Sequence, residues 1–510
     1  MAAKRTVQIG PFAKGMNNFS DPSALPDDAA ADILNMELDL DGSLVSRPPF
    51  TATTVVMGGG SPVTPKLLGY YYAANGDEYL IASDRVTNTY YSINGGPWVL
   101  ITATFAATAM TQFDNKAWLL APVGSANPGG TWSPTAGFIA EADMPKGTTI
   151  VAFKFRLWIA QGDQATANGS RMYFSKVLGV TPFWPVVPEF IDIAKGDGQS
   201  IVAIRTYYDS LLIFRTESIY RFMYTSDPAA GVIEVSVPGV GLESVSALAT
   251  NENYFYFMHD DRAYEYMNGR ASELSQALIF KSSSKTGFIE PKSVSIFNGR
   301  AIFSYYENQY VFSLKTRTWS RWHSPAAGGL ASINQRRGSL SDSFAGYVAS
   351  SKSGDGKLYR IIDSFTTDSE DFTCSVATKI FNYDSSSIYK RLYWWGVDAI
   401  YRQQVRGVVV PITYGGQVTW GELLTKTWGE LLMGTWAQPT SKGLSVETIR
   451  PDVGASAQRK FTKFLKQLRF RQVQFRVEFL TDGSSSTSPV RLFSIHTEVT
   501  AAQGVSKAIT

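Results

Sequence analysis

The sequence predicts a mainly β protein, a β-propeller of six or seven blades with an N-terminal extension and a C-terminal β-sandwich-like domain. Aromatic residues make up 13% of the 510 positions, and together with 43 Gly and 23 Pro they favour many short strands joined by tight turns. Long helical periodicity is nearly absent. A strand–turn–strand pattern also recurs about every 45 residues, which is the length of a propeller blade.

Composition excludes several classes of protein. The chain is 44% apolar and 18% charged, so it can bury a substantial core. The balance of 47 Lys and Arg against 44 Asp and Glu leaves +3, too little to bind nucleic acid or membrane through bulk charge. A single cysteine, Cys374, excludes a disulfide framework and a multi-Cys metal site. No apolar run is long enough to span a membrane and no signal peptide begins the chain, so we expect a soluble protein made in a cytoplasm.

Residues 1–64 are predicted to form an extension. A proline-led acidic stretch at 26–28 indicates the start of one short helix. Two short strands should follow, joined by the Asp41-Gly42 turn. Six acidic residues and no basic one lie between positions 27 and 41, which makes the extension locally negative.

The same stretch copies the opening of a calcium loop. Glu37, Asp39, Asp41 and Gly42 have the spacing of its first ligands. Pro48 occupies the twelfth position, where such a loop needs a bidentate Glu. A plain hairpin turn is therefore favoured over a metal site.

Residues 65–370 contain the repeat, whose clearest copies span 210–222, 253–267, 300–314 and 346–362. Each copy is an apolar strand, a polar turn and a second strand with a tyrosine. The apolar strands are anchored at Leu212, Tyr256, Ile302 and Val348, and the tyrosines are Tyr220, Tyr264, Tyr310 and Tyr359. Weaker copies occur at 69–83, 115–122 and 155–162. The regular spacing favours a closed propeller over an open sandwich array, with the tyrosines at equivalent blade positions.

The pattern changes after residue 370. Longer strands are predicted at 371–381, 389–401 and 405–415, and a final pair at 473–483 and 488–500. These strands indicate a second β domain over residues 371–500 that resembles a sandwich, followed by a loose tail at 501–510.

Motifs that carry chemistry are missing. The sequence has no P-loop, no G-x-S-x-G elbow and no WD dipeptide, and only one poor match to a sialidase Asp-box at 353–356. We therefore expect no enzyme activity, no catalytic residue, no metal site and no organic cofactor.

The segment 459–476 is strongly basic and carries no acid. Its first half is amphipathic if helical, and its second half alternates, with the apolar residues from 473 to 479 facing inward. A solvated face, contact with phosphate and docking on an acidic subunit surface all fit. We favour docking on an acidic partner surface, where complementary charge fixes the register of the contact. The seven candidate residues are Arg459, Lys460, Lys463, Lys466, Arg469, Arg471 and Arg476.

Two apolar groups are candidates for an assembly interface. The stretch TWGELLTKTWGELLMGTW places three tryptophans at steps of eight, on one face of an extended ribbon. A packed hairpin or a subunit interface would explain them. The extension carries a second group, which must be covered by a neighbouring chain or by the second domain. The candidates are Ile33, Leu34, Met36, Trp420, Trp428 and Trp436.

Three stretches of the sequence, at residues 26–48, 190–222 and 468–499, together resemble the tail nozzle or hub proteins of short-tailed bacteriophages. The opening matches their N-terminal signature of an acidic turn, a Leu-Asn pair, a DG hairpin and an Arg-Pro element. Residues 190–222 are similar to their propeller segment, and residues 468–499 are similar to their terminal strand pair. The signature positions are Pro26, Leu34, Asn35, Asp41, Gly42, Arg47 and Pro48.

The resemblance implies a structural virion protein. Such proteins form a sixfold ring below the portal and its adaptor, continue the DNA channel, help to retain packaged DNA and anchor fibres or spikes. The expected partners are thus identical subunits, the adaptor side, fibres or spikes, and passing double-stranded DNA. The expected location is the virion tail, assembled in the host cytoplasm. The alternatives are a minor tail or baseplate protein that binds receptor through its propeller, and a virion glycan depolymerase.

Overall fold

Strands dominate the chain. Two short 3-10 turns, η1 (Pro228–Ala230) and η2 (Val245–Ala247), are the helical segments among the described residues. None of the helices described there is long and apolar enough to cross a membrane. The computed structural model describes residues 4–52, 57, 65–93, 96–162, 169–251, 254–282, 291–323, 330–335, 345–350, 358–362, 372–383, 390–401, 405–412, 445–449, 459–464, 468–470, 472–481 and 490–501.

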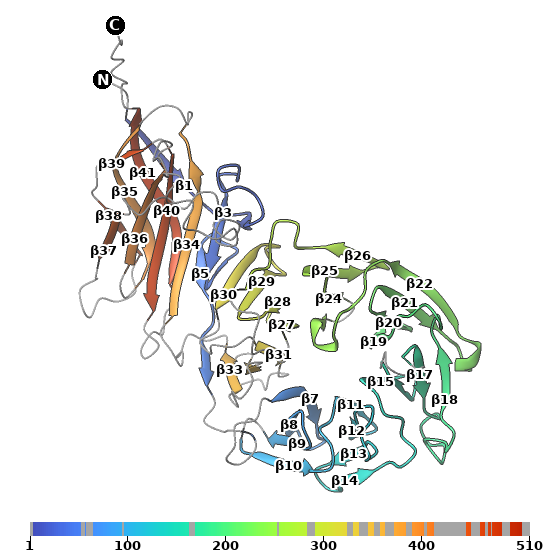
Figure 1. Ribbon diagram of the computed structural model, residues 1–510. Helices are drawn as coiled ribbons and strands as arrows, with labels where there is room; N and C mark the ends of the chain where they lie inside the picture. Colours follow the sequence, from blue (N-terminus) through green and yellow to red (C-terminus); the bar gives the residue numbers. More distant parts are fainter. Residues whose placement is uncertain are drawn as a thin grey trace, which may run out of the picture.

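Six four-stranded antiparallel sheets and the first four strands of a ten-stranded sheet form a ring of seven blades in the described part of the chain (Figure 1). The ring closes where the innermost strand of the seventh sheet contacts that of the first. The predicted propeller is therefore confirmed, with seven blades. Blades 1 to 3 comprise β7 (Lys66–Tyr72), β8 (Glu78–Ser83), β9 (Thr89–Ile93), β10 (Trp98–Thr102); β11 (Ala109–Phe113), β12 (Lys116–Leu120), β13 (Gly130–Ser133), β14 (Gly137–Ala140); and β15 (Thr149–Phe153), β16 (Arg156–Ala160), β17 (Arg171–Phe174), β18 (Glu189–Asp192).

Blades 4 to 7 follow in chain order, except that the last strand of blade 7 comes from the N-terminal segment. They comprise β19 (Ile201–Tyr207), β20 (Ser210–Arg215), β21 (Ser218–Met223), β22 (Val232–Pro238); β23 (Leu248–Asn251), β24 (Tyr254–His259), β25 (Arg262–Met267), β26 (Arg270–Glu273); β27 (Lys292–Phe297), β28 (Arg300–Tyr305), β29 (Asn308–Ser313), β30 (Trp319–His323); and β31 (Leu330–Gln335), β32 (Ala345–Ser350), β33 (Leu358–Ile362), β6 (Phe50–Ala52).

The second strands of the blades are apolar on both faces because each blade packs between two neighbours. In β12, Ala117 and Leu119 join the cluster shared with blade 1, whereas Trp118 and Leu120 join the cluster shared with blade 3. Successive side chains of a strand point to opposite faces, so a continuous apolar run is what a blade buried on both sides requires.

The repeat tyrosines occupy equivalent positions, as predicted. Tyr220, Tyr264, Tyr310 and Tyr359 all lie on the third strand of their blades. The first three pair with the residue that follows the predicted anchor, whereas Tyr359 pairs with Val348 itself. The position equivalent to the other three anchors is therefore Tyr347, one residue before the predicted Val348, because the turn in this copy is longer.

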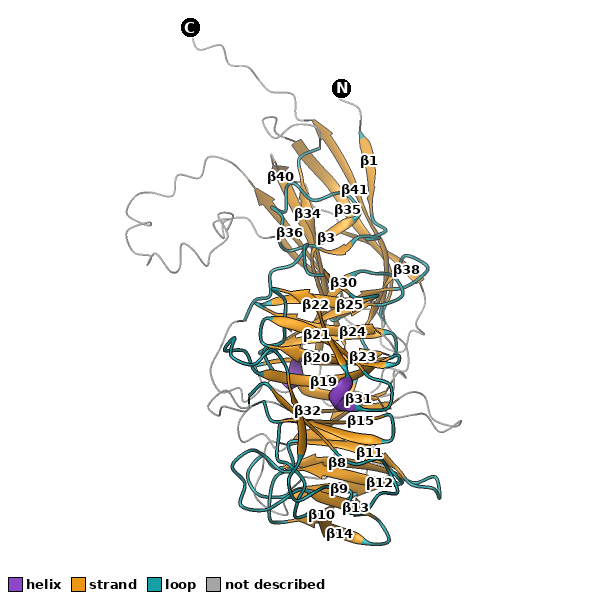
Figure 2. Cartoon of the chain, turned by 90° about the vertical axis from the view of Figure 1, so that its right-hand side faces the viewer, coloured by secondary structure: helices purple, strands orange, loops and turns teal. Residues whose placement is uncertain are grey.

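The C-terminal part forms two further sheets that pack against each other like a sandwich and stand at one end of the propeller (Figure 2). One sheet has the order β38-β35-β41-β5-β4, with β1 and β39 beside it; the other continues blade 6 as β3-β34-β40-β36-β37. Their strands are β1 (Arg5–Ile9), β2 (Gly15–Met16), β3 (Ala29–Leu34), β4 (Met36–Leu38), β5 (Leu44–Ser46), β34 (Phe372–Phe381), β35 (Lys390–Ile400), β36 (Val405–Ile412), β37 (Ser445–Ile449), β38 (Arg459–Phe464), β39 (Leu468–Phe470), β40 (Gln472–Thr481) and β41 (Arg491–Ala501).

The N-terminal segment differs from the prediction in two ways. The expected helix is wrong, since residues 29–34 form β3 and pair with strands on both sides; tertiary pairing overrides a weak local preference for helix. The segment is also no separate extension, because β1 to β5 lie in the second domain and β6 completes blade 7. The hairpin is confirmed, with β4 and β5 joined through Gly42 at φ +82°.

Candidate functional site

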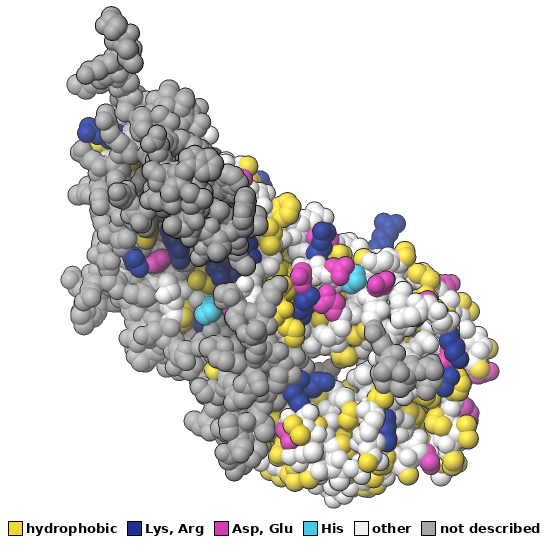
Figure 3. All heavy atoms as spheres, in the orientation of Figure 1, with side chains coloured by type: hydrophobic (Ala, Val, Ile, Leu, Met, Phe, Trp, Pro, Cys, Tyr) yellow, Lys and Arg dark blue, Asp and Glu magenta, His cyan; other side chains and the backbone are white. Residues whose placement is uncertain are grey.

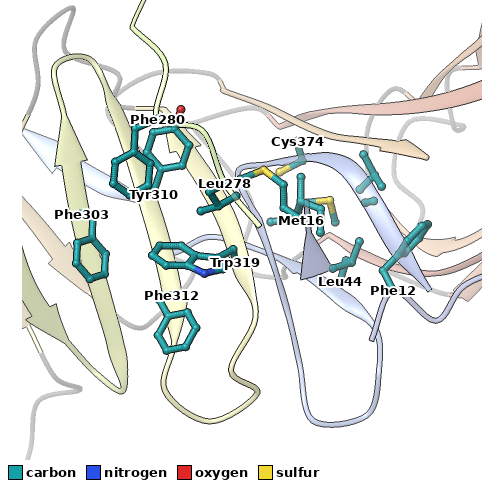
Figure 4. Close-up of a cluster of buried hydrophobic side chains, with 14 of the residues drawn as sticks. Phe12, Met16, Leu44, Leu278, Phe280, Phe303, Tyr310, Phe312, Trp319 and Cys374 are labelled. Carbon is teal, nitrogen blue, oxygen red and sulfur yellow. The ribbon is translucent and has the colours of Figure 1, made fainter. Parts of the chain in front are cut away.

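The N-terminal segment joins the two domains. Strand β3 lies between the outer strand of blade 6, which it meets in parallel, and β34, which it pairs in antiparallel fashion. The result is one ten-stranded sheet that runs from the propeller into the sandwich. Met16, Trp319 and Cys374 belong to a single buried cluster that extends across this joint (Figure 4).

Asn35 is the centre of the joint. It is buried at φ +54°, a conformation that Asn tolerates better than most residues. Its side-chain oxygen accepts hydrogen bonds from Arg47 Nε at 3.1 Å and from the backbone N–H of His323 at 2.8 Å. Its Nδ2 donates to the Thr373 carbonyl at 2.8 Å, and its backbone N–H donates to the Arg321 carbonyl at 2.7 Å. One side chain thus links both domains.

Arg47 is the fully buried partner of Asn35. Its guanidinium lies 4.0 Å from the ring of Phe372 in the sandwich and 4.6 Å from the ring of Phe50 in blade 7. A planar cation between two aromatic faces is stabilised by the ring quadrupoles. Asn35 and Arg47 are both positions of the N-terminal signature. They therefore have a structural role, because they hold the two domains together at this joint.

The acidic residues of the extension pair with cations of their own chain. Glu37 Oε1 lies 2.5 Å from Arg300 Nη2, and Asp32 Oδ2 lies 2.8 Å from Arg321 Nη2. Both arginines belong to blade 6. Asp39 and Asp41 pair with a sandwich arginine, Arg491. These pairs within the chain reduce the negative charge that the extension could offer to a neighbouring molecule.

The candidate interface residues of the extension are packed within the chain. Ile33 and Met36 are fully buried in the largest core cluster, and Leu34 is partly buried. Of the two predicted ways to cover this group, the second domain of the same molecule is the one that the structure shows, so Ile33 and Met36 are core residues and not part of a subunit interface. Trp420, Trp428 and Trp436 lie outside the described residues.

The basic segment 459–476 is extended in its described parts. Its first half forms β38, so the helical alternative is wrong. In β40 the inward residues are confirmed as buried. Lys460 and Arg469 lie on the described strands β38 and β39, whereas Lys466 and Arg471 lie outside the described residues. The buried residues of β40 are Val473, Phe475, Val477 and Phe479.

Two of the basic residues are already paired. Arg459 binds Asp398 through two hydrogen bonds of 2.9 and 2.6 Å, and Arg476 Nε lies 3.0 Å from Glu478 Oε1. The local charge of the segment is therefore lower than the sequence indicates.

The outer face of the sheet containing β35 and β38 is rich in aromatic rings. We call Trp394, Arg459, Phe461, Lys463 and Phe493 the sandwich-face patch. Lys463 Nζ lies 4.5 Å from the Trp394 ring, and the Arg459 guanidinium lies 4.0 Å from the Phe493 ring. Phe461 is half exposed. A solvent-facing sheet surface usually carries polar residues, so this patch is a candidate contact surface.

A second exposed patch lies on the inner hairpin tips of blades 3 and 4 and on the loop between β17 and β18. We call Phe155, Val177, Leu178, Val180 and Tyr208 the propeller-tip patch. Phe155 and Tyr208 are 71% and 64% exposed, and the other three are at least 39% exposed. The backbone N–H of Leu178 donates to the Phe155 carbonyl, which brings the loop of Leu178 beside the tip of blade 3.

Phe155 is unusual in its backbone as well as in its exposure. It has φ +58° and Tyr208 has φ +49°, in the left-handed region that bulky residues rarely adopt. Lys154 Nζ lies 2.8 Å from Asp209 Oδ1, so an ion pair ties the two tips together. Sequence reasoning missed this patch, although two aromatic residues in tight turns were a possible signal.

The propeller also has an open cavity along its centre. It has a volume of about 490 Å³ and is lined by the innermost strands β7, β11, β15, β19, β23 and β27. Two of its lining residues, Lys66 and Arg205, are cationic, and none of those described is acidic. In Figure 3 basic side chains border the hollow at the centre of the ring. Among the described residues no group of three or more His, Cys, Asp or Glu is placed to hold a metal ion.

Comparison with known proteins identifies no family for this chain. No family model matches the chain, and no curated protein matches it. The similar solved structures include the extracellular domain of a putative one component system from B. thetaiotaomicron, at 11% identity and TM-score 0.42, where the match covers 63% of this chain and 41% of that one. They also include the Neurospora crassa Pan2 WD40 domain (10%, TM-score 0.37, 59% and 89%) and BBS1N in complex with ARL6DN (10%, TM-score 0.41, 62% and 97%).

Proposed function

We propose that this protein is a non-enzymatic ring subunit of a short-tailed bacteriophage tail, located between the adaptor side and the fibres or spikes. The resemblance of the N-terminal signature supports this role, and the same residues join the propeller and the sandwich into one continuous sheet. A ring subunit that contacts its neighbours through both domains needs the two domains to be firmly connected, as they are at this joint. On this proposal the protein assembles in the host cytoplasm and resides in the virion.

The observation that carries the proposal is the presence of two unlike exposed patches. A closed ring is held by head-to-tail contacts, which join two different surfaces of each subunit. The propeller-tip patch lies among blades 3 and 4, whereas the sandwich-face patch lies on the sheet of β35 and β38, toward the opposite end of the molecule (Figure 1). Each patch combines aromatic rings with nearby charges, as subunit contacts commonly do.

We assign the occupant of the propeller-tip patch to a second copy of this chain. An exposed aromatic residue with a strained backbone conformation costs free energy. Such residues are found mainly at functional sites and contact surfaces. We assign contact with the adaptor to other surfaces of the subunit. These include the basic residues of 459–476 that are not part of the sandwich-face patch. The number of subunits is taken from the resemblance, which implies six.

A substitution can separate assembly from folding. Phe155→Asn removes the exposed ring but suits the left-handed backbone, so the unfolding midpoint should stay unchanged or rise. Wild-type chain should form closed rings, seen by light scattering after gel filtration and by negative-stain microscopy. Phe155→Asn should shift the population strongly toward monomer. Val86→Ser removes another highly exposed apolar side chain, from blade 1, and should assemble like the wild type.

Two results would contradict the proposal. The first is a wild-type chain that stays monomeric both alone and when mixed with its adaptor ring. The second is Phe155→Asn rings identical to those of the wild type. Location has its own test, because antibodies against the chain should label the tail end of purified virions in electron micrographs.

A further inference from the structure

The outer strand of blade 4, β22, is a sheet edge with a long row of backbone groups. In blades 1 to 5 the outermost strand has one partner strand in the described sheet, so the N–H and C=O groups on its other side are not used there. β22 covers seven residues, whereas the outer strands of the other four blades cover four or five. Of these five edges, β22 therefore gives a further strand the most to pair with.

The side chains of β22 are mostly apolar and include one unpaired acid. Val232 and Val235 are 54% and 55% exposed. Glu234 is also exposed and forms no ion pair with a described residue, although it lies opposite Arg221 in the register. The acids on the other outer strands of blades 1 to 5 are paired, in the contacts Lys176–Glu189, Arg171–Asp192 and Arg262–Glu273. β22 thus combines an apolar edge with a negative charge that no described residue pairs.

Pairing of β22 with a further strand is favoured over its first four residues. A bulge at Ser236 shifts its register against β21, and Pro238 at its end has no N–H to donate. Both features disfavour a partner strand at this end. Residues 232–235 form a regular ladder with β21 and carry the exposed side chains, so a partner strand belongs there.

The sandwich strand β38 is an edge of opposite charge. It has one neighbour in the described order of its sheet, β35, and its sequence RKFTKF holds three basic residues and no acid. Arg459, Phe461 and Lys463 belong to the sandwich-face patch and alternate along the strand with residues that face the other way. Arg459 already binds Asp398, whereas Lys463 is exposed and forms no ion pair with a described residue. Among the described side chains of this edge, Lys463 is therefore the cation available to another chain.

Strand addition at a blade edge already occurs twice in this chain. The outer strand of blade 6 receives β3, and β33 of blade 7 receives β6. β22 and β38 cannot pair with each other within one molecule, because they lie on opposite sides of it (Figure 1). Two copies can join them, and opposite charges then face each other across the new strand pair.

We propose that β22 of one copy pairs edge to edge with β38 of the next copy, so that an intermolecular sheet joins blade 4 to the sandwich and Glu234 meets Lys463. This inference rests on the proposed ring function, since it names the strands through which neighbouring copies meet. The main-chain hydrogen bonds of the added strand supply affinity, and the pair of opposite charges fixes the register.

Exchange of the two charges tests the contact. Glu234→Lys and Lys463→Glu should each raise the concentration needed for half-maximal assembly by about tenfold or more, because like charges then oppose each other across the strands. The variant that carries both substitutions should recover most of this loss. Glu217→Lys makes the same charge change at an exposed turn of the same blade and should assemble like the wild type. Light scattering measures assembly, and an unfolding midpoint equal to that of the wild type shows that a variant is folded.

Cross-links and amide exchange test the strand pairing itself. Cys374 is the one cysteine of the chain and is buried, so introduced cysteines report without background. An equal mixture of Glu234→Cys and Lys463→Cys chains should form disulfide-linked pairs under mild oxidation, whereas a mixture of Glu217→Cys and Lys463→Cys chains should not. The backbone amides of β22 and β38 should exchange at least about tenfold more slowly in the assembled protein, because paired N–H groups are protected.

Several results would overturn the strand pairing and leave the proposed ring function standing. One is a wild-type ring whose β22 amides exchange as fast as those of the monomer. Others are charge variants that assemble like the wild type, or a combined variant that assembles no better than the single ones. A wild-type chain that does not assemble, alone or with its adaptor ring, would instead overturn the ring function, and this inference with it.

Discussion

Blades 6 and 7 are neighbours in the ring, but their outer edges are completed in opposite ways. Blade 7 receives its fourth strand, β6, from residues 50–52 and ends there. Blade 6 has its own fourth strand, β30, and is then extended by β3 into the sandwich. In blades 1 to 5 the outermost strand is the end of the described sheet.

The difference shows how one short segment performs two tasks. Unpaired sheet edges are a liability that proteins cover or shorten. Here β6 completes the outer edge of blade 7, and β3, which ends 16 residues earlier in the chain, converts the edge of blade 6 into a domain joint. We infer that stability is concentrated where the N-terminal segment meets blades 6 and 7, and that the free outer edges tolerate change.

The largest effect is expected at the closure of blade 7. Phe50 is fully buried and makes an edge contact with Trp322 at 6.2 Å. Phe50→Ala leaves a cavity between blades 6 and 7 and should lower the free energy of unfolding by about 3–5 kcal/mol. Chemical denaturation measures the loss. Val99→Ala, on the exposed outer strand β10 of blade 1, should change it by less than about 0.5 kcal/mol.

Similar losses for the two substitutions would break the comparison. A large loss at Val99 would mean that free outer edges matter as much as the closure. A small loss at Phe50 would mean that the ring holds without a tightly packed β6.

An intermediate effect is expected at the joint of blade 6. Asn35→Gly keeps the left-handed backbone but removes the side-chain hydrogen bonds to both domains, which should cost about 1–3 kcal/mol. Asn35→Ala should cost about 1 kcal/mol more, because alanine is strained at φ +54°. Asn268→Gly, at an exposed turn with φ +51°, should be nearly neutral. Denaturation curves for the three variants give the order, and equal stability of Asn35→Gly and Asn268→Gly would refute the role of the joint.

The smallest effect concerns an ionic contact between blades 5 and 6. Burial alone would raise the pKa of Glu265, but hydrogen bonds from Arg317 and Tyr256 outweigh it and hold that pKa below its ordinary value. A carboxyl with a lowered pKa adds stability above its ordinary pKa, and this stability is lost as the pH falls through the folded value. Glu265→Gln should therefore cost about 1 kcal/mol at pH 7, where solvent screens the half-exposed Arg317, and much less near pH 3.

Urea titrations of wild type and Glu265→Gln at the two pH values provide the measurement. Arg262→Gln, whose Glu273 contact lies within blade 5 and is more exposed, serves as the control. A pH-independent difference between wild type and Glu265→Gln would show that packing, rather than charge, joins blades 5 and 6.

The sequence predicted the features that repeat locally and missed those that depend on distant partners. The tyrosine spacing located the third strands, and Asp41-Gly42 located a hairpin, because both patterns lie within a few residues. The local sequence at 29–34 favours a helix. It forms a strand because it pairs with β30 and β34, which lie about 300 residues away in the sequence. The cavity could not be predicted for the same reason, since its lining strands come from separate blades and surround one space only when the ring closes. By contrast, Phe155 lies in a tight turn, and an aromatic residue in a tight turn is a local signal of an exposed side chain.

The completion of blade 7 by β6 also determines when this blade can form during synthesis of the chain. Phe50 leaves the ribosome early, but its partner Ile361 is made about 300 residues later. At synthesis rates of roughly 5–20 residues per second, this delay is about 15–60 s. Strands β3 and β6 must stay unpaired with these partners for that interval, with apolar residues such as Ile33 and Phe50 not yet buried in the mature core. The nascent chain therefore has its longest exposure to proteases and chaperones at its own beginning.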